Sequence, residues 1–199
     1  MKSALILVAL AAFVPAPQDT FKTDDEGFIR NWLVLAPISI EEGSAAQEID
    51  KAQVKDEAKI KPKAGEKVKA GTKEVTWTAH KTADFFIDFK ESFDKNAGED
   101  VVGYAVAYVW AEAEMKDVKL KVGSNDQCKA WLNGKDVLKF DETRTLEKDQ
   151  NEGSVTLNKG ENVLVFKVIN EKNNWQGCAR FTDKTGAALK GLKIALAPQ

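Results

Sequence analysis

The chain has 199 residues, of which 43% are hydrophobic and 30% are charged, and its formal net charge is −2. This length and composition indicate one globular domain, with two small domains as the less favoured alternative. Charges of both signs are interspersed along the chain. We therefore expect no nucleic acid among its partners, because binding to phosphate needs a basic field.

The first residues read MKSALILVALAAFVPAPQ, with one Lys2 followed by an unbroken apolar run and then small residues. This pattern is typical of a secretory signal peptide, and the run is too short to cross a bilayer. We expect residues 1–16 to be a signal peptide, with Ala11 or Ala12 as alternative cleavage points to Ala16. A folded N-terminal strand is the competing interpretation. The mature protein is then secreted or periplasmic, with no membrane span after signal removal.

The polar residues 17–27 are expected to form a disordered linker before a single domain over residues 28–199. The segment FIRNWLVLAPI predicts the first strand, which Pro37 should end because proline interrupts a strand ladder.

Residues 41–71 are rich in Ala, Lys and Glu and almost free of aromatic residues. Ser44 fits a helix N-cap, and Ala45, Ile49 and Ala52 form a thin apolar stripe. This predicts an insertion with one short surface helix that ends before Pro62, followed by a charged loop. Because its charges balance, we interpret the segment as a solvated insertion, with a docking tail as the alternative.

Two strand-like pieces follow, one around Val75 and Trp77 and one in which Phe85, Ile87 and Phe89 alternate with a second set of residues. In the second piece the alternating neighbours are Phe86, Asp88 and Lys90, of which only the last two are polar. The two pieces predict a half-buried sheet. His80, the only histidine in the chain, lies between them, and we expect it to be solvated or structural and not a catalytic base.

The segment 101–114, VVGYAVAYVWAEAE, is the most continuous apolar run after the N-terminus. Read with a period of two, alternate residues from Ala105 to Ala113 form a face of small side chains. The residues between them, beginning at Tyr104 and including Tyr108 and Trp110, form an aromatic face. A helix is the competing interpretation, but the Tyr, Val and Trp content favours a central strand. The small face should pack against an opposing sheet, and another segment, such as 41–71, should cover the aromatic face.

Between 118 and 170 the alternation is clearest, with turn residues between short strands. Asn133 and Gly134 predict a tight hairpin turn. A Lys-Gly turn at Lys159 leads into a strand in which Leu164, Phe166 and Val168 share one face and Lys167 lies on the other. Many short strands without a βαβ rhythm predict an all-β fold, an antiparallel β-sandwich.

The strings GSNDQCKAWLNGKDV and LNKGENVLVFKV resemble the galactose-binding-like jelly roll, which includes sugar-binding sandwich domains attached to glycoside hydrolases. FIRNWLVLAPI, YAVAYVWAEAE and NNWQGCARFTDKTG look similar to uncharacterised secreted β-sandwich proteins of planctomycete-type bacteria. The resemblance implies the jelly-roll fold and, more weakly, sugar binding, because that fold hosts binding modules, docking domains and spacers alike.

Cys128 and Cys178 are expected to be in an oxidising compartment, where a pair of cysteines usually forms a disulfide. Strand alternation argues against the bond, because it places Cys128 on an inner face and Cys178 on the face of Arg180. Both states therefore remain open.

The chain lacks a GxSxG elbow, a phosphate loop, an HExxH motif and a second histidine, so we expect no enzyme. Hydrolysis of a glycan by two facing carboxylates is a minor alternative.

Residues in loops and on outer faces are the candidates for ligand binding, because sandwich domains bind sugars by aromatic stacking and by side-chain amides and guanidinium groups. The alternatives are structural: Trp175 can cap the core, and Arg180 can pair with Asp183 or a glutamate. No cofactor is expected, although Asp126 and Asp149 are candidate ligands of a structural Ca²⁺, with turn or cap roles as the alternative. The candidates are Asn125, Asp126, Trp131, Arg144, Asn174, Trp175 and Arg180.

Two functions follow from these observations. The first is a secreted, non-catalytic carbohydrate-binding-like module whose partner is a glycan. The alternative is a structural or protein-interaction domain of the bacterial cell envelope, whose partner is an envelope protein. Burial of the tryptophan side chains favours the second function, and exposure of two of them on one surface favours the first.

Overall fold

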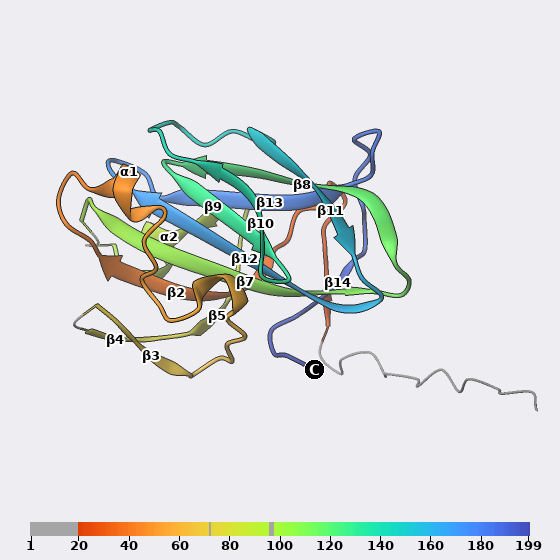
Figure 1. Cartoon of the computed structure of the whole chain (residues 1–199), viewed down its shortest axis with the longest axis horizontal. Helices are drawn as coiled ribbons and strands as arrows, with labels where there is room; N and C mark the ends of the chain where they lie inside the picture. Colours follow the sequence, from red (N-terminus) through yellow and green to blue (C-terminus); the bar gives the residue numbers. More distant parts are fainter. Residues whose placement is uncertain (1–19, 72, 96–97) are drawn as a thin grey trace, which may run out of the picture.

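The computed structural model describes residues 20–71, 73–95 and 98–199 (Figure 1). The expected signal peptide, residues 1–16, lies outside the described residues. Within the described ranges, no helix combines the length and hydropathy that a membrane span requires.

The described residues form two main antiparallel sheets and a separate hairpin. The larger sheet contains β1 (Phe21–Lys22), β2 (Asn31–Ser39), β5 (Thr78–Lys81), β7 (Val101–Ala111), β9 (Cys128–Leu132), β10 (Lys135–Phe140), β12 (Gly160–Asn170) and β14 (Lys193–Ala195). The smaller sheet has the order β11 (Asn151–Leu157), β8 (Met115–Asn125), β13 (Gln176–Thr182) and β6 (Ile87–Asp88). The hairpin joins β3 (Lys67–Ala70) to β4 (Lys73–Thr76), and the helices are α1 (Ala45–Glu48), α2 (Phe89–Phe93) and a 3-10 turn, Glu57–Lys59.

The pair β7 and β12 lies at the centre of the larger sheet and is in register along its whole length, from Gly160 opposite Ala111 to Asn170 opposite Val101. On one side β12 pairs with β9, and on the other β7 pairs with both β2 and β14. The predicted all-β antiparallel sandwich is confirmed. The Asn133–Gly134 hairpin also forms, with both residues at positive φ as this turn requires.

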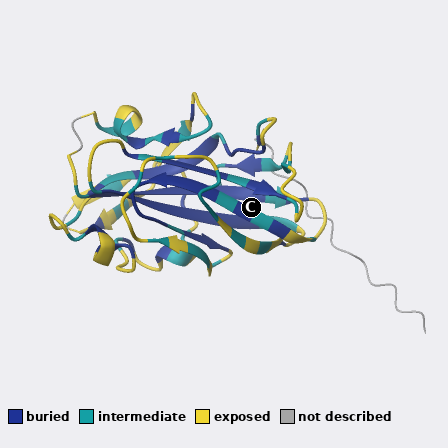
Figure 2. Cartoon of the chain, turned by 90° about the horizontal axis from the view of Figure 1, so that it is seen from above, coloured by how far each residue is buried: buried dark blue, intermediate teal, exposed yellow. Residues whose placement is uncertain are grey.

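Two hydrophobic cores lie on the two faces of the larger sheet, so its central strands are mostly dark blue in Figure 2. The first core lies between the sheets and contains Ala105, Ala107 and Val109 of β7 together with Leu120 of β8. The second lies on the outer face, where segment 41–77 covers Tyr104, Val106 and Tyr108. The expected division of β7 into a small face and a covered aromatic face is confirmed.

Lys167 is the most deeply buried charged residue on the outer face of β12, at 0% exposure. Its Nζ donates to the backbone oxygens of Glu48, Ile49 and Lys51 at 2.8, 3.2 and 2.8 Å. It also lies 3.4 Å from Glu57 Oε2. These carbonyls sit at and just beyond the end of α1, where a helix leaves acceptors without partners, so Lys167 satisfies them and fixes the insertion to the sheet.

The insertion is folded more tightly than the sequence indicates. Its helix spans only α1, and the expected charged loop instead forms the 3-10 turn and β3. Tyr104 Oη donates to Glu57 Oε2 at 2.5 Å and Tyr108 Oη donates to the Pro62 oxygen at 2.8 Å. Contacts with the sheet therefore override helix propensity, which is only a weak determinant of structure.

Three further expectations are corrected. β2 continues through Pro37 to Ser39, because a register shift between Leu35 and Ile38 accommodates the proline. The alternation predicted beyond Ile87 gives way to α2, which the Asp88 carboxylate caps by accepting from Glu91 N at 2.9 Å. Residues 20–27, expected to be part of a disordered linker, form β1 on β14 and a turn.

Replacing the buried ammonium group by a methyl thioether in Lys167→Met should lower the free energy of unfolding by about 3–5 kcal/mol, because Glu57 and three backbone oxygens lose a charged donor inside the protein. Urea unfolding measures this loss. Lys172→Met, at an exposed lysine, is the control and should change stability by less than about 0.5 kcal/mol. Equal stability of both variants would contradict the role given to Lys167.

Candidate functional site

The two tryptophans proposed for sugar stacking are both buried. Trp131 does lie opposite the core between the sheets, as expected, but the outer face is itself covered and leaves the residue 2% exposed. Trp175 is 0% exposed, stacks on Phe89 at 4.8 Å between ring centroids, and donates from Nε1 to the Val168 oxygen at 3.2 Å. Trp175 therefore caps the core, and neither indole offers a face to a ligand in this structure.

Asp126 and Arg144 come together at the end of the sandwich where β8 turns into β9. The Asp126 carboxylate accepts from the backbone N–H groups of Arg144, Glu171 and Lys172, at 3.1, 2.9 and 3.2 Å. The Arg144 guanidinium donates to the Ser124 oxygen and Oγ and lies 3.7 Å from the centroid of the Phe140 ring. Both side chains bind the protein itself and hold three loops together.

Asn125 and Asn174 differ in their access to solvent. Asn125 is 4% exposed and donates from Nδ2 to the Arg144 oxygen at 2.9 Å, while its Oδ1 is buried without a partner. The buried Oε1 of Gln127 and Oδ1 of Asn170, at the same end, also lack partners. Asn174 is exposed. Of the candidates at this end, only Asn174 is fully open to a ligand.

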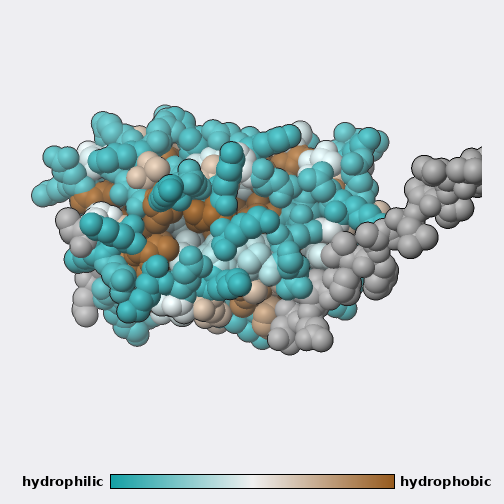
Figure 3. Space-filling model, turned by 60° about the horizontal axis from the view of Figure 1, so that its bottom comes forward, coloured by the Kyte–Doolittle hydropathy of each residue, from teal (hydrophilic) through white to brown (hydrophobic). Residues whose placement is uncertain are grey.

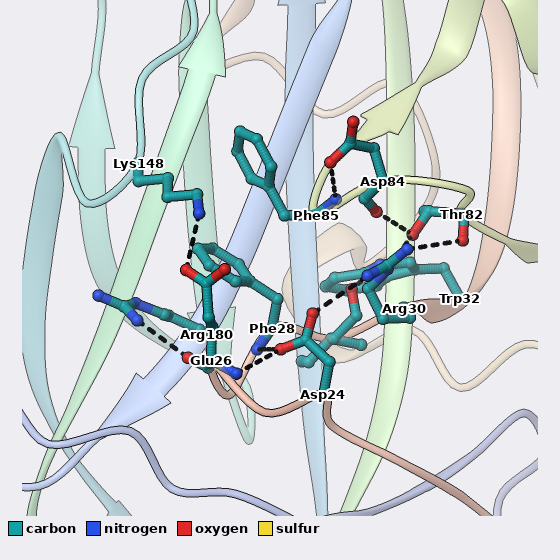
Figure 4. A network of polar contacts seen from close by, with 11 residues as sticks. Asp24, Glu26, Phe28, Arg30, Trp32, Thr82, Asp84, Phe85, Lys148 and Arg180 are labelled. Atoms are coloured by element: carbon teal, nitrogen blue, oxygen red, sulfur yellow. Dashed lines mark hydrogen bonds and ion pairs between the residues drawn. The ribbon is translucent and has the colours of Figure 1, made fainter.

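Arg180 lies in a separate network beside the N-terminal segment (Figure 4). Its Nε donates to Asp149 Oδ1 at 2.8 Å, its Nη2 bonds the other oxygen of that carboxylate, and Nη1 donates to the Glu26 oxygen at 2.9 Å. Lys148 reaches the Glu26 carboxylate from the other side at 2.7 Å. The partner of Arg180 is thus Asp149 and not Asp183, whose carboxylate instead caps its own turn.

Asp126 and Asp149, the two candidate ligands of a structural Ca²⁺, each have partners within the protein. Asp149 is bonded to Arg180, and Asp126 is saturated by backbone donors in the other cluster. In the described part of the chain, no group of three or more acidic, histidine or cysteine side chains could hold a metal ion. The two aspartates do not form a shared site.

Both cysteines are free thiols and buried, so the disulfide alternative is not realised. Cys128 belongs to the core between the sheets, 3.7 Å from Arg144 Nη2. On β13, Ala179 and Phe181 face that core, which leaves Cys178 on the opposite side of the strand beside Gly123. The alternation that argued against the bond is therefore the physical reason for its absence.

His80 lies within β5, opposite Trp32, and its ring is edge-on to the Phe93 ring at 5.0 Å between ring centroids. Burial lowers its pKa, and its contacts are structural.

An open groove of about 390 Å³ was not predicted from the sequence. It lies between β10 and β11, the edge strands of the two sheets, and the β9–β10 turn closes one end. Leu132, Val137 and Val155 provide apolar surface. Polar groups surround it: Asp117, Asn133, Lys135, Asp136, Ser154, Thr156 and Asn158.

Internal contacts hold the groove in shape. The Asn133 side chain donates to Asn162 Oδ1 and accepts from Val163 N, both at 2.8 Å. At Gly153, a Cβ would lie 2.4 Å from Val137 Cγ1, so only glycine lets β10 and β11 approach so closely before they separate. The signal in the sequence was Gly153 within a strand pattern, which indicates close approach of another backbone.

No protein-family model matches the chain, and no curated protein matches it. Among solved structures, a PA14 sugar-binding domain from an RTX adhesin is 10% identical, with a TM-score of 0.45 over 81% of this chain and 95% of that one. The PA14 domain of the MpAFP antifreeze protein is 11% identical, with a TM-score of 0.39 over 92% and 96%. The GH31 α-xylosidase Xac1773 from Xanthomonas citri is 11% identical, with a TM-score of 0.36 over 61% and 14%.

Similarity at this level assigns neither a family nor a ligand to this chain. The resemblance to galactose-binding-like domains and to planctomycete-type proteins stays a prediction.

The two thiols provide a direct check of the cysteine assignment. Burial raises the pKa of Cys128, and it raises that of Cys178 to about 12, so neither thiol should react with Ellman's reagent in the folded protein at pH 8. After unfolding in guanidinium chloride without reductant, two thiols per chain should react. No reaction after unfolding would show that a disulfide forms.

Proposed function

We propose that this protein is a secreted or periplasmic, non-catalytic module that binds carbohydrate in the groove between β10 and β11. The observation that carries the proposal is the composition of the groove, where hydroxyl, amide and carboxylate groups surround an apolar floor. Sugars present the same combination of hydroxyl groups and apolar C–H faces. A volume of about 390 Å³ falls within the range of roughly 300–1,000 Å³ typical of small-molecule sites.

The polar groups of the groove differ in their hydrogen bonding and exposure. Asn133 is fixed by two hydrogen bonds, whereas Ser154, Thr156 and Asn158 are exposed on β11 and the turn after it. Asp136 lies 3.5 Å from Lys129 and is 71% exposed, the setting of an ordinary surface carboxylate. The lining contains neither histidine nor cysteine, and hydrogen bonds from sugar hydroxyl groups are what it can provide.

A structural or protein-interaction role in the cell envelope is the second candidate. The burial of Trp32, Trp77, Trp131 and Trp175 favours it, because it removes the aromatic faces that most sugar-binding sandwich domains use. This function predicts protein partners that co-purify with the chain and no affinity for glycans.

The groove is tested by the double variant Asp136→Ala/Thr156→Ala, which removes two exposed polar groups from its rim. A neutral-glycan array identifies a ligand, and calorimetric titration should then show at least about tenfold weaker binding, since each lost hydrogen bond is worth roughly 1 kcal/mol. Asn174→Ala at the other end is the matched control and should bind as the unmodified protein does. Absence of binding to every neutral glycan, or a loss confined to Asn174→Ala, would contradict the proposal.

A further inference from the structure

A second groove lies in the insertion, about 370 Å³ in volume, where β3 and the preceding loop meet Trp77. Ile60, Val68 and the buried Trp77 form its apolar side. Its charged lining residues are Lys55, Lys61 and Lys69 and one acid, Glu66. Figure 3 views the molecule with the side of β3 and β4 brought forward. Apolar atoms form a band there, bordered by hydrophilic side chains.

Charge is concentrated on this part of the insertion. Residues 55–73 contain seven lysines against Asp56, Glu57 and Glu66, a formal charge of +4, which leaves −6 for the rest of the chain. One of the three acids, Glu57, is buried and bonded to Tyr104 and Lys167, so it does not reach the surface. The balance of charge over 41–71 therefore conceals a separation: six of its seven acids lie before residue 58, and six of its seven lysines lie after residue 54.

The lysines of the groove differ in how their charge is compensated. Lys61 pairs with Glu161 at 2.9 Å. Lys55 and Lys69 are exposed, and neither has an ion-pair partner among the residues that the structure describes. Two uncompensated ammonium groups thus face the rim of one apolar groove.

Hydrogen bonds fix the walls of this groove. Gly65 N donates to the Trp77 oxygen and Trp77 N donates to the Glu66 oxygen, both at 2.8 Å, which ties the loop before β3 to the residue between β4 and β5. The Pro62 oxygen accepts from Tyr108 on the sheet beneath. The lysines therefore project from a backbone that is already positioned.

We propose that this second groove binds an acidic polysaccharide, with Lys55 and Lys69 pairing with its carboxylate or sulfate groups and the apolar side contacting a sugar ring. The ammonium groups complement a polyanion with charges spaced along a chain. A groove suits a single flexible chain. A flat anionic membrane or a rigid nucleic-acid duplex would also contact the rest of the protein, whose formal charge is −6, and like charges would repel. The inference goes beyond the neutral-glycan site at β10 and β11.

The test is affinity electrophoresis in gels that contain polygalacturonate, dextran sulfate or neutral dextran, with Lys55→Glu/Lys69→Glu as the variant. Lys184→Glu/Lys190→Glu changes the net charge equally at exposed lysines outside the groove and is the matched control. Polygalacturonate or dextran sulfate should retard the unmodified protein and the control alike, and bind the groove variant at least about tenfold more weakly. Neutral dextran should give no difference between the variants.

The proposal would be overturned if the control variant bound the acidic polymers as weakly as the groove variant, or if neither acidic polymer retarded the unmodified protein. Tighter binding to duplex DNA or to phosphatidylglycerol vesicles than to the acidic polymers would also overturn it. Should the groove variant fail to fold, lysine acetylation of the unmodified protein decides the question. Polygalacturonate should then protect Lys55 and Lys69 but not Lys184. The Asp136→Ala/Thr156→Ala variant should retain polygalacturonate binding, so the two proposed sites succeed or fail separately.

Discussion

The buried ammonium group of Lys167 is the interaction on which the outer half of this structure depends. A lysine loses hydration when it is buried and needs several acceptors in return. Here three backbone oxygens and Glu57 provide them, all from residues 48–57. Because these acceptors belong to the insertion and the lysine belongs to the central strand β12, the interaction couples the stability of the insertion to that of the sheet. Burial also lowers the pKa of Lys167, which Glu57 opposes.

This arrangement gives the larger sheet two covered hydrophobic faces, so groups that bind a ligand must lie outside those faces. Antiparallel sheets commonly leave one face to solvent, but here the aromatic face of β7 and the indole of Trp131 are covered by the insertion. Trp77 and Trp131 on this face are thereby lost as stacking surfaces. Two accessible concave surfaces of the described residues are the groove between β10 and β11 and the groove beside Trp77. Each is bordered by polar groups, the first mainly neutral or acidic and the second basic.

The sequence predicts those parts of the fold that local patterns determine. The strand β7, its two faces and the Asn133–Gly134 turn follow from alternation and from positive-φ geometry. The end of α1 could not be predicted from local sequence, because the oxygen of its last residue, Glu48, accepts a hydrogen bond from Lys167, 119 residues away. For α2 the information was present, since Asp88 and Glu91 form a capping pattern, but the alternation of apolar residues obscured it.

The candidate sites were harder to predict than the fold. Asp126, Arg144 and Arg180 carry the residue types of a binding site, and yet their partners are backbone N–H groups and other side chains of the same chain. Both grooves require neighbours from distant segments, β10 with β11 and β3 with Trp77, which no local pattern reveals. The lysines of 55–73 were visible in the sequence, but averaging their charge over 41–71 concealed them.

Trp32, Trp77, Trp131 and Trp175 belong to the two cores and form no binding surface. Iodide quenching of tryptophan fluorescence tests this assignment most directly, because iodide reaches only indoles that are open to solvent. Four of the five tryptophans are at most 2% exposed, and Trp110 is half-buried. The account predicts that any quenchable emission disappears in Trp110→Phe. Quenching that persists in Trp110→Phe and is removed by Trp131→Phe would contradict it.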